Sequence, residues 1–252
     1  MILFTGIKLL RESKKFLYQE YIKNHNICLD EDKVYMNLKY DHSYDCLKIL
    51  KSIAFKKYLK YSSSILLHDV GRFYEYKKID NFKHAQYGYL ILKKNYTKNP
   101  LILLPVKYHE SDLNWLEELY LDTEYLNCNY YYRKEIIKCC QLVRDIDVIS
   151  NMKSILNSST NKQADDINYK LIKVFKNGDL ARKEMIKNEY DQIIYILCGL
   201  SVITDKASYR YLKKKKIVKE LIEKLFVLSP NNNKAKKVTI QIKDIVNEKY
   251  NI

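Results

Sequence analysis

Ser-Ser-Ser-Ile-Leu-Leu-His-Asp-Val-Gly-Arg-Phe, at residues 62–73, is the most informative stretch of the 252-residue sequence. Its apolar run leads directly into His68 and Asp69, two residue types that bind metal ions. Gly71 follows, and we expect it either to end a helix or to let two backbones approach closely. Arg72 lies within one helical turn of the His-Asp pair, where its five donors can hold a phosphate group.

Helical periodicity dominates the sequence on both sides of this stretch. Only five Gly and three Pro occur, which is too few for the turns of a sandwich, a barrel or a doubly wound sheet. Apolar residues recur at helical spacing in the stripes Leu47–Ala54, Ala85–Leu92, Ile136–Val143 and Ile193–Leu200. Further helices are expected at 111–120, 179–203, 207–229 and 236–250, with breaks at 157–163 and 229–233. The sequence therefore predicts an all-α protein.

Composition indicates a globular chain, because 47% of the residues are hydrophobic although 30% are charged. No apolar run approaches the ~20 residues of a membrane span, and the N-terminus has no secretory leader. Six Cys without a C-x-x-C pair are typical of reduced thiols, so we expect a cytoplasmic protein with no membrane partner. We treat residues 1–252 as one domain, with a core at about 36–162 and a C-terminal helical flank at about 163–252.

The chain is basic, with 45 Lys and Arg against 30 Asp and Glu and a net charge of +15, which attracts anionic partners. Lys supplies all but six of the basic residues, whereas readers of nucleic acid usually rely on Arg. The run Lys213–Lys216 is typical of a solvated face, and the tyrosines at 125–132 are typical of a helical core with a polar edge. Nucleic acid is therefore a possible partner that the sequence does not favour.

The histidines and two aspartates carry the chemistry. Their wide spacing suits ligands gathered from separate helices into the interior of a bundle. Imidazole and carboxylate together form a typical ligand set for Fe, Mn, Zn or Ni. The candidates are His42, His68, Asp69, His84, His109 and Asp145, and His25 remains as a surface residue.

Three segments resemble the HD superfamily of metal-dependent phosphohydrolases, whose signature is H…HD…D on an all-α core. A bacterial subgroup carries H-D-I-G-R-F, then D-H-A-x-x-G, then R-D-A-D. The corresponding segments here are His68–Phe73, Lys83–Gly88 and Arg144–Asp147, and the matching region spans about 39–150. The resemblance implies an HD-type helical bundle with additional C-terminal helices.

Ligand roles follow from this resemblance. It implies that a first divalent ion is held by His42, His68, Asp69 and Asp145, and a second by Asp69, His84 and His109. The ion or ions could be Mn, Fe, Mg, Ni or Zn. The chain departs from the subgroup where His109-Glu110 replaces H-N and where R-D-I-D-V-I-S replaces R-D-A-D-K-L-D. Asp147 is expected on a different helix face from Asp145, as a surface acid.

The resemblance also implies the reaction, hydrolysis of a phosphate mono- or diester by metal-activated water, with a nucleotide or related small molecule as substrate. Asp69 and Arg72 are the candidate catalytic residues, and Arg72, Lys83 and Lys107 are the candidate substrate contacts. Arg72 could alternatively form a structural ion pair with Glu75.

Two other functions remain open. A few HD-fold proteins bind two irons and activate oxygen with a similar ligand set, and dependence of turnover on O₂ would identify that class. A basic helical module that binds nucleic acid without catalysis is the other alternative. Its affinity would fall steeply with salt and would survive loss of His68 and Asp69.

Overall fold

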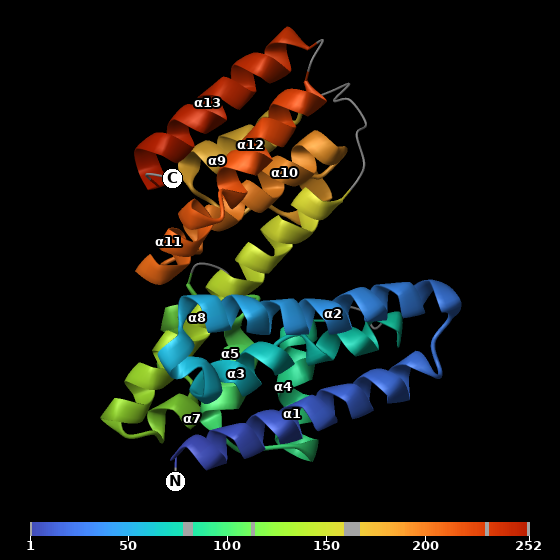
Figure 1. The fold of residues 1–252 in the computed structure, drawn as a ribbon, viewed down its shortest axis with the longest axis vertical. Coiled ribbons are helices and arrows are strands. Elements are labelled where there is room, and N and C mark those ends of the chain that lie inside the picture. Colours follow the sequence, from blue (N-terminus) through green and yellow to red (C-terminus); the bar gives the residue numbers. More distant parts are fainter. Residues whose placement is uncertain (1, 78–82, 112–113, 159–166, 230–231, 251–252) are drawn as a thin grey trace. The chain divides into compact units, whose positions relative to one another are not determined.

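The computed structural model describes residues 2–77, 83–111, 114–158, 167–229 and 232–250 (Figure 1). Every regular element among these residues is a helix, which confirms the predicted all-α class. The chain divides into two compact units, residues 1–146 and 147–252, and the division falls inside one continuous helix. The boundary thus lies earlier than the core end near residue 162 that the sequence suggested. No described helix is long and apolar enough to cross a membrane.

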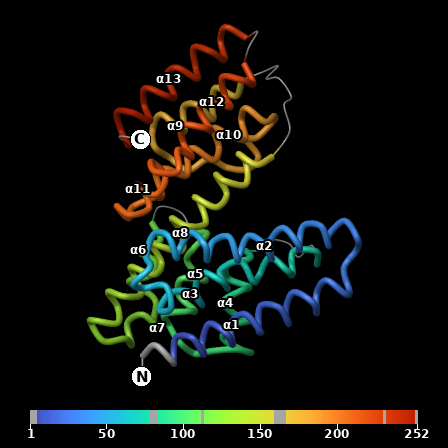
Figure 2. Tube along the Cα trace, in the orientation of Figure 1, coloured from blue at the N-terminus to red at the C-terminus, as the bar shows by residue number. Residues whose placement is uncertain are grey.

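The first unit is built around one short, buried helix. This is α3, in which every residue from Tyr61 to Leu67 is buried, and it packs against α1, α2 and α5 (Figure 2). The elements of the unit are α1 (Ile2–His25), α2 (Asp30–Ile53), η1 (Phe55–Lys57), α3 (Tyr58–Leu67), η2 (Val70–Lys77), α4 (His84–Asn95), α5 (Pro100–Tyr108), α6 (Trp115–Tyr120), α7 (Thr123–Leu126) and α8 (Tyr130–Asn157). Because α3 ends at Leu67, the His-Asp pair begins at the end of the most buried helix.

A hydrogen bond joins α3 to α5 where a proline interrupts the backbone pattern. Pro105 lies inside α5 and has no N–H, so it cannot donate to the carbonyl of Leu101 one turn earlier. The hydroxyl of Ser64 donates to that carbonyl at 2.7 Å. Asn99 caps the start of the same helix by accepting from the Leu101 N–H. The α5 helix is therefore tied to α3 at its first turn as well as by its apolar side chains.

Gly71 allows η2 to touch α4 directly. A Cβ atom at this position would lie 2.8 Å from the backbone nitrogen of Gly88 and closer still to the carbonyl oxygen of His84. The close approach of two backbones was one of the two interpretations of Gly71, and the structure confirms it. This contact brings His84, the first residue of α4, beside the segment that follows His68 and Asp69.

The second unit is a smaller helical group. Its helix α10 packs against α9 and α12, and α12 packs against α13. The elements are α9 (Tyr169–Asn177), η3 (Lys183–Met185), α10 (Glu189–Cys198), η4 (Gly199–Ser201), α11 (Lys206–Lys214), α12 (Ile217–Leu228) and α13 (Asn233–Tyr250).

Several helix boundaries differ from the predicted ones. The expected helix at 179–203 begins only at Glu189, where the Asn188 side chain caps it, and α9 precedes it. The expected helix at 207–229 is two helices, because Lys216 adopts a left-handed conformation with φ of 54°. The helix expected at 111–120 begins at Trp115. Most of the loop expected at 157–163 lies outside the described residues, and the break near 229–233 agrees with the gap between α12 and α13.

Candidate metal centre

Four histidines and one aspartate from four parts of the first unit converge on one buried point. His42 lies in the middle of α2, and His68 and Asp69 follow α3. His84 begins α4, and His109 ends α5. All but His42 are fully buried, and the His42 side chain is only 9% exposed. Four of the five histidines in the chain thus meet, as the sequence predicted.

The two carboxylate oxygens of Asp69 face different pairs of imidazoles. The Oδ1 atom lies 3.2 Å from Nε2 of His84 and 3.3 Å from Nε2 of His109. The Oδ2 atom lies 3.8 Å from Nε2 of His68 and 3.9 Å from Nε2 of His42. A carboxylate arranged in this way can bridge two cations, each with its own pair of imidazole ligands.

Backbone carbonyls orient two of the imidazoles. Nδ1 of His68 lies 2.8 Å from the carbonyl oxygen of Ile65, and Nδ1 of His109 lies 2.8 Å from that of Val106. Both histidines use the carbonyl three residues earlier at the end of a helix, so Nδ1 carries the proton and donates it. The lone pair then resides on Nε2, which faces Asp69 and is the atom that binds a metal ion.

Glu110 orients the third imidazole. Its Oε2 atom accepts a hydrogen bond from Nδ1 of His84 at 2.8 Å. Burial raises the pKa of Glu110, but this bond and the charge of His84 outweigh it and lower the pKa overall. The change from H-N to His109-Glu110 therefore supplies a carboxylate–histidine pair, an arrangement that raises the basicity of a metal ligand.

The His84 and His109 rings share a single proton between their Nε2 atoms, which are 3.0 Å apart. Burial lowers the pKa of both rings. Hydrogen bonds to Asp69 and Glu110 more than offset this for His84, whose pKa is raised, whereas that of His109 is lowered. The pKa values of the two rings are thus shifted in opposite directions.

Helix α8 brings Asp147, and not the predicted Asp145, to this point. Donor atoms within 4.8 Å of one another form three groups among the described residues: His42, Cys46 and His68; His42, His68, Asp69 and Asp147; and Asp69, His84 and His109. Asp145 is buried but belongs to none of them. Residues two apart are separated by about 200° around a helix, so only one of the two can face the cluster.

This finding corrects two expectations. Asp147 directly follows the last residue of the first unit in an unbroken helix, and it is half-buried rather than a surface acid. Its Oδ1 atom accepts a hydrogen bond from Asn151 at 3.0 Å. The segment R-D-I-D thus contributes its second aspartate to the cluster.

Arg144 positions the turn that carries His109. The buried guanidinium donates from Nη1 to the carbonyls of Tyr108, His109 and Ser111, at 2.9, 3.2 and 2.6 Å. It also lies over the ring of Trp115, 5.5 Å from the centroid. Arg144, the arginine of the R-D-I-D segment, therefore fixes the backbone on both sides of the candidate ligand His109. The sequence did not indicate this role.

Two cations flank Asp69. Nζ of Lys39 lies 3.3 Å from Oδ2, and Nε of Arg72 lies 3.5 Å from Oδ1. Burial raises the pKa of Asp69, but Lys39 and the neighbouring imidazoles outweigh it and hold that pKa well below its usual range. Lys39 was not predicted, although it lies three residues before His42 on the same face of α2.

Arg72 also forms the ion pair with Glu75 that was the alternative interpretation of this residue. Its Nη1 atom lies 2.5 Å from Oε1 of Glu75. The hydroxyl of Tyr35 donates to Oε2 of the same carboxylate at 2.6 Å. Arg72 is therefore held in place beside Asp69, in contact with two carboxylates.

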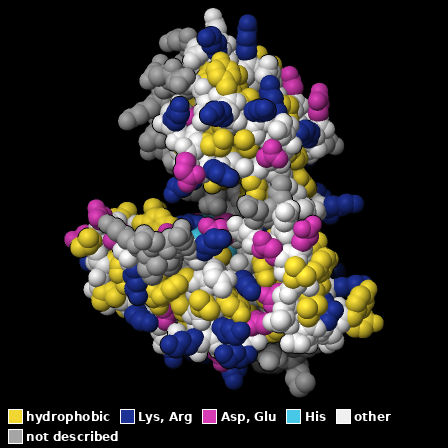
Figure 3. Space-filling view, turned by 180° about the vertical axis from the view of Figure 1, so that it is seen from behind, with side chains coloured by type: hydrophobic (Ala, Val, Ile, Leu, Met, Phe, Trp, Pro, Cys, Tyr) yellow, Lys and Arg dark blue, Asp and Glu magenta, His cyan; other side chains and the backbone are white. Residues whose placement is uncertain are grey.

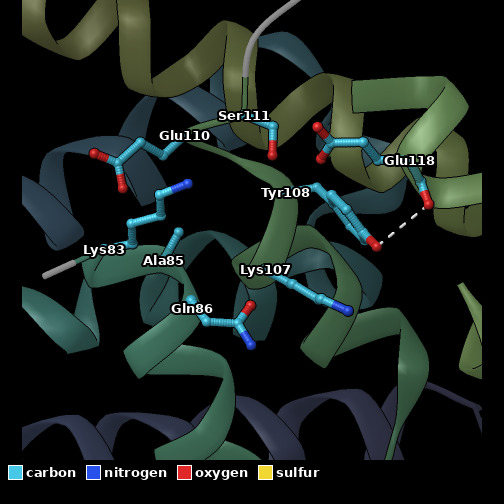
Figure 4. Close-up of a pocket in the computed structure, with 8 residues that line it drawn as sticks. All are labelled: Lys83, Ala85, Gln86, Lys107, Tyr108, Glu110, Ser111 and Glu118. Carbon is cyan, nitrogen blue, oxygen red and sulfur yellow. Dashed lines mark hydrogen bonds between the residues drawn. The ribbon is translucent and has the colours of Figure 1, made fainter. Parts of the chain in front are cut away.

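A polar cavity of about 450 Å³ adjoins the segments that carry His84 and His109 (Figure 4). Lys83 and Glu110 lie at one end of it, and Tyr108 and Glu118 lie at the other. Lys107 also lines the cavity, and its Nζ atom donates to Asp122 at 2.6 Å. Both lysines predicted to contact substrate thus line one cavity beside the cluster.

The donor set fits divalent metal ions. It combines imidazole nitrogens with carboxylate oxygens, the ligands of Mn, Fe and Zn sites in helical proteins. Residues 40–152 match the family model described as the HD domain, and this range includes every residue of the cluster. Searches of curated proteins and of solved structures found no significant match to the chain.

Proposed function

Residues 40–152 match the family model of the HD domain, and from this premise we propose that the protein is a metal-dependent phosphohydrolase. It cleaves a phosphate mono- or diester of a nucleotide or a related small molecule. The observation that carries this proposal is the position of Asp69, whose two oxygens face two different imidazole pairs. Bound divalent ions supply Lewis acidity and lower the pKa of a coordinated water toward neutrality.

The ligand assignment follows the two groups that contain Asp69. We assign His42, His68, Asp69 and Asp147 to one ion. His84 and His109, together with Asp69, hold the other, which replaces the single proton that these two rings otherwise share. Glu110 and Arg144 hold the ligands of this second ion in position. Glu110 fixes the His84 ring, and Arg144 fixes the turn that bears His109.

Basic side chains around the cluster suit a phosphate group. Lys39 and Arg72 lie on either side of Asp69, and Lys83 and Lys107 line the adjoining cavity. Arg72 is fixed by Glu75 and can hold developing negative charge without reorganisation. A cavity of about 450 Å³ is of the size that takes a nucleotide-sized ligand.

A small substrate is favoured over a nucleic-acid polymer. Figure 3 shows Lys and Arg side chains interspersed with Asp and Glu on the visible face, and no continuous basic stripe crosses that face. Tracking of a phosphate backbone requires such a stripe or groove.

The test begins with metal analysis of the purified protein and continues with a panel of phosphate mono- and diesters in Mn²⁺, Fe²⁺ or Mg²⁺. We expect hydrolysis of at least one ester class, and we expect Asp69→Ala to abolish it. Asp45→Ala is the matched control, because Asp45 lies on α2, has a half-exposed side chain and pairs only with Lys48 among the interactions described. Full hydrolysis by Asp69→Ala, or turnover that requires O₂, would contradict the proposal.

A further inference from the structure

Cys46 is a buried thiol at the edge of the candidate metal centre that the proposed mechanism does not use. It lies one turn after His42 on α2, and its side chain is 1% exposed. Its Sγ atom is 3.5 Å from Nε2 of His42. Ligand atoms of His42, Cys46 and His68 all lie within 4.8 Å of one another.

The distance between the thiol and the imidazole matches that of two ligands on one ion. Zn–N bonds are about 2.0–2.1 Å and Zn–S bonds about 2.3 Å, so a tetrahedral ion separates an N and an S ligand by about 3.5 Å. The observed separation of Cys46 Sγ and His42 Nε2 is 3.5 Å. Residues four apart also lie on the same face of a helix, which is why His42 and Cys46 present their donors together.

Two donor sets of different chemistry therefore share the same pair of imidazoles. His42 and His68 belong to the group with Asp69 and Asp147, and they also belong to the group with Cys46. Carboxylate oxygens favour hard ions such as Mg²⁺ and Mn²⁺, whereas a thiolate favours softer ions.

We propose that His42, Cys46 and His68 form a separate position for a thiophilic divalent ion such as Zn²⁺, Co²⁺ or Cd²⁺. This inference rests on the proposed function only in that it uses two of the same histidines. Binding replaces the thiol proton of Cys46 with the ion and releases that proton to solvent. Because the two positions share His42 and His68, they cannot be filled together. An ion held by Cys46 thus displaces the ion that Asp69 and Asp147 would hold.

A simpler arrangement is a hydrogen bond in which the Cys46 thiol donates to Nε2 of His42. The two accounts differ in one measurable property, the presence of a sulfur–metal bond. Co²⁺ reports this directly, since its visible ligand-field bands appear with any ligand set. The near-ultraviolet sulfur-to-cobalt charge-transfer band appears only with a thiolate ligand.

The experiment titrates the metal-free 252-residue protein with Co²⁺ and records both sets of bands. We expect ligand-field bands and a charge-transfer band in the natural sequence. The charge-transfer band should be absent in Cys46→Ala and present in Cys198→Ala, a matched control at a buried thiol of the second unit. The charge-transfer band is measured first in the natural sequence, so this part of the result does not depend on whether a variant folds. Cys46→Ser provides a second substitution that is closer in size and polarity to cysteine.

The two sets of bands test this inference and the proposed function separately. Ligand-field bands without a charge-transfer band would overturn the thiol site and leave the proposed metal centre in place. A charge-transfer band that persists in Cys46→Ala and Cys46→Ser would also overturn it. Absence of all cobalt bands would contradict both the thiol site and the proposed metal centre.

Discussion

Gly71→Ala is the substitution that most severely tests how the fold positions the metal centre. The added methyl group would lie 2.8 Å from the backbone nitrogen of Gly88 and would overlap the carbonyl oxygen of His84. Real Cβ atoms essentially never approach another heavy atom more closely than 3.0 Å. Both obstacles are backbone atoms, so no side-chain rotation relieves them. Helix α4 must retreat by about 1 Å merely to reach this limit, because the carbonyl oxygen of His84 would lie 2.0 Å from the added Cβ.

The expected cost has two parts. Overpacking of this kind lowers the free energy of unfolding by about 1–3 kcal/mol. His84 is the first residue of α4, so its imidazole moves when the helix moves. Metal ligands must stay within about 0.5 Å of their binding positions, so this movement weakens metal binding. We therefore expect the affinity for the second Mn²⁺ ion to fall by about 10–100-fold, the range typical when the support of a ligand is lost.

Urea unfolding and Mn²⁺ titration calorimetry measure the two parts separately. Gly178→Ala is the control, because Gly178 has φ of 78° and no atom lies within 4 Å of the added Cβ. It should cost about 1 kcal/mol through backbone strain and leave Mn²⁺ affinity unchanged. A Gly71→Ala protein with the stability and Mn²⁺ affinity of the natural sequence would refute the reasoning.

Three further predictions concern a contact between α3 and α5, the support of His109, and an ion-pair group on α8. Ser64→Ala should lower the free energy of unfolding by about 1–3 kcal/mol in urea titrations, because the buried Leu101 carbonyl loses the hydrogen bond that it accepts from the Ser64 hydroxyl. An unchanged free energy of unfolding would contradict this. Arg144→Lys should weaken Mn²⁺ binding by about 10–100-fold, since one ammonium cannot reproduce the guanidinium contacts behind His109; unchanged affinity would count against it. Partial burial raises the pKa of Glu135, but hydrogen bonds from two lysines and a tyrosine lower it overall to about 2. Glu135→Gln should therefore cost about 1 kcal/mol at pH 7, and the difference should shrink as the pH falls from about 4.5 toward 2; a difference that grows on acidification would refute this sign.

The convergence of the histidines could be predicted because it depends on residue types that are rare in this chain. Two of its five histidines, His42 and His68, fall at the histidine positions of the H…HD…D pattern, and the resemblance assigned His84 and His109 to a second ion. The all-α class followed from the shortage of Gly and Pro and from the apolar stripes. These signals are local in the sequence, and the structure bears them out.

The choice between Asp145 and Asp147 could not be made from spacing alone. Both residues lie on α8, and the face of that helix that turns toward the histidines depends on packing against other elements. Lys39 and Glu110 were missed for a related reason. Their roles depend on which side chains become neighbours after folding, and a charged residue beside a motif does not show its partner.

Helix boundaries in the second unit were missed where local conformation outweighed periodicity. The apolar pattern continues through 207–229, but the left-handed residue Lys216 divides it into two helices. Capping by Asn188 sets the start of α10 at Glu189, later than the start near residue 179 that we expected. Periodicity identifies the buried face of a helix more reliably than it identifies the ends.

The stoichiometry of bound Mn²⁺ tests the central claim most directly, because that claim is that one carboxylate, Asp69, serves two ions. Native mass spectrometry of the Mn²⁺-loaded protein should show two ions per chain. His84→Ala should retain one, at the set formed by His42, His68, Asp69 and Asp147. Asp69→Ala should retain none at the same Mn²⁺ concentration. Two ions bound to a folded Asp69→Ala protein, or none bound to the natural sequence, would contradict the account.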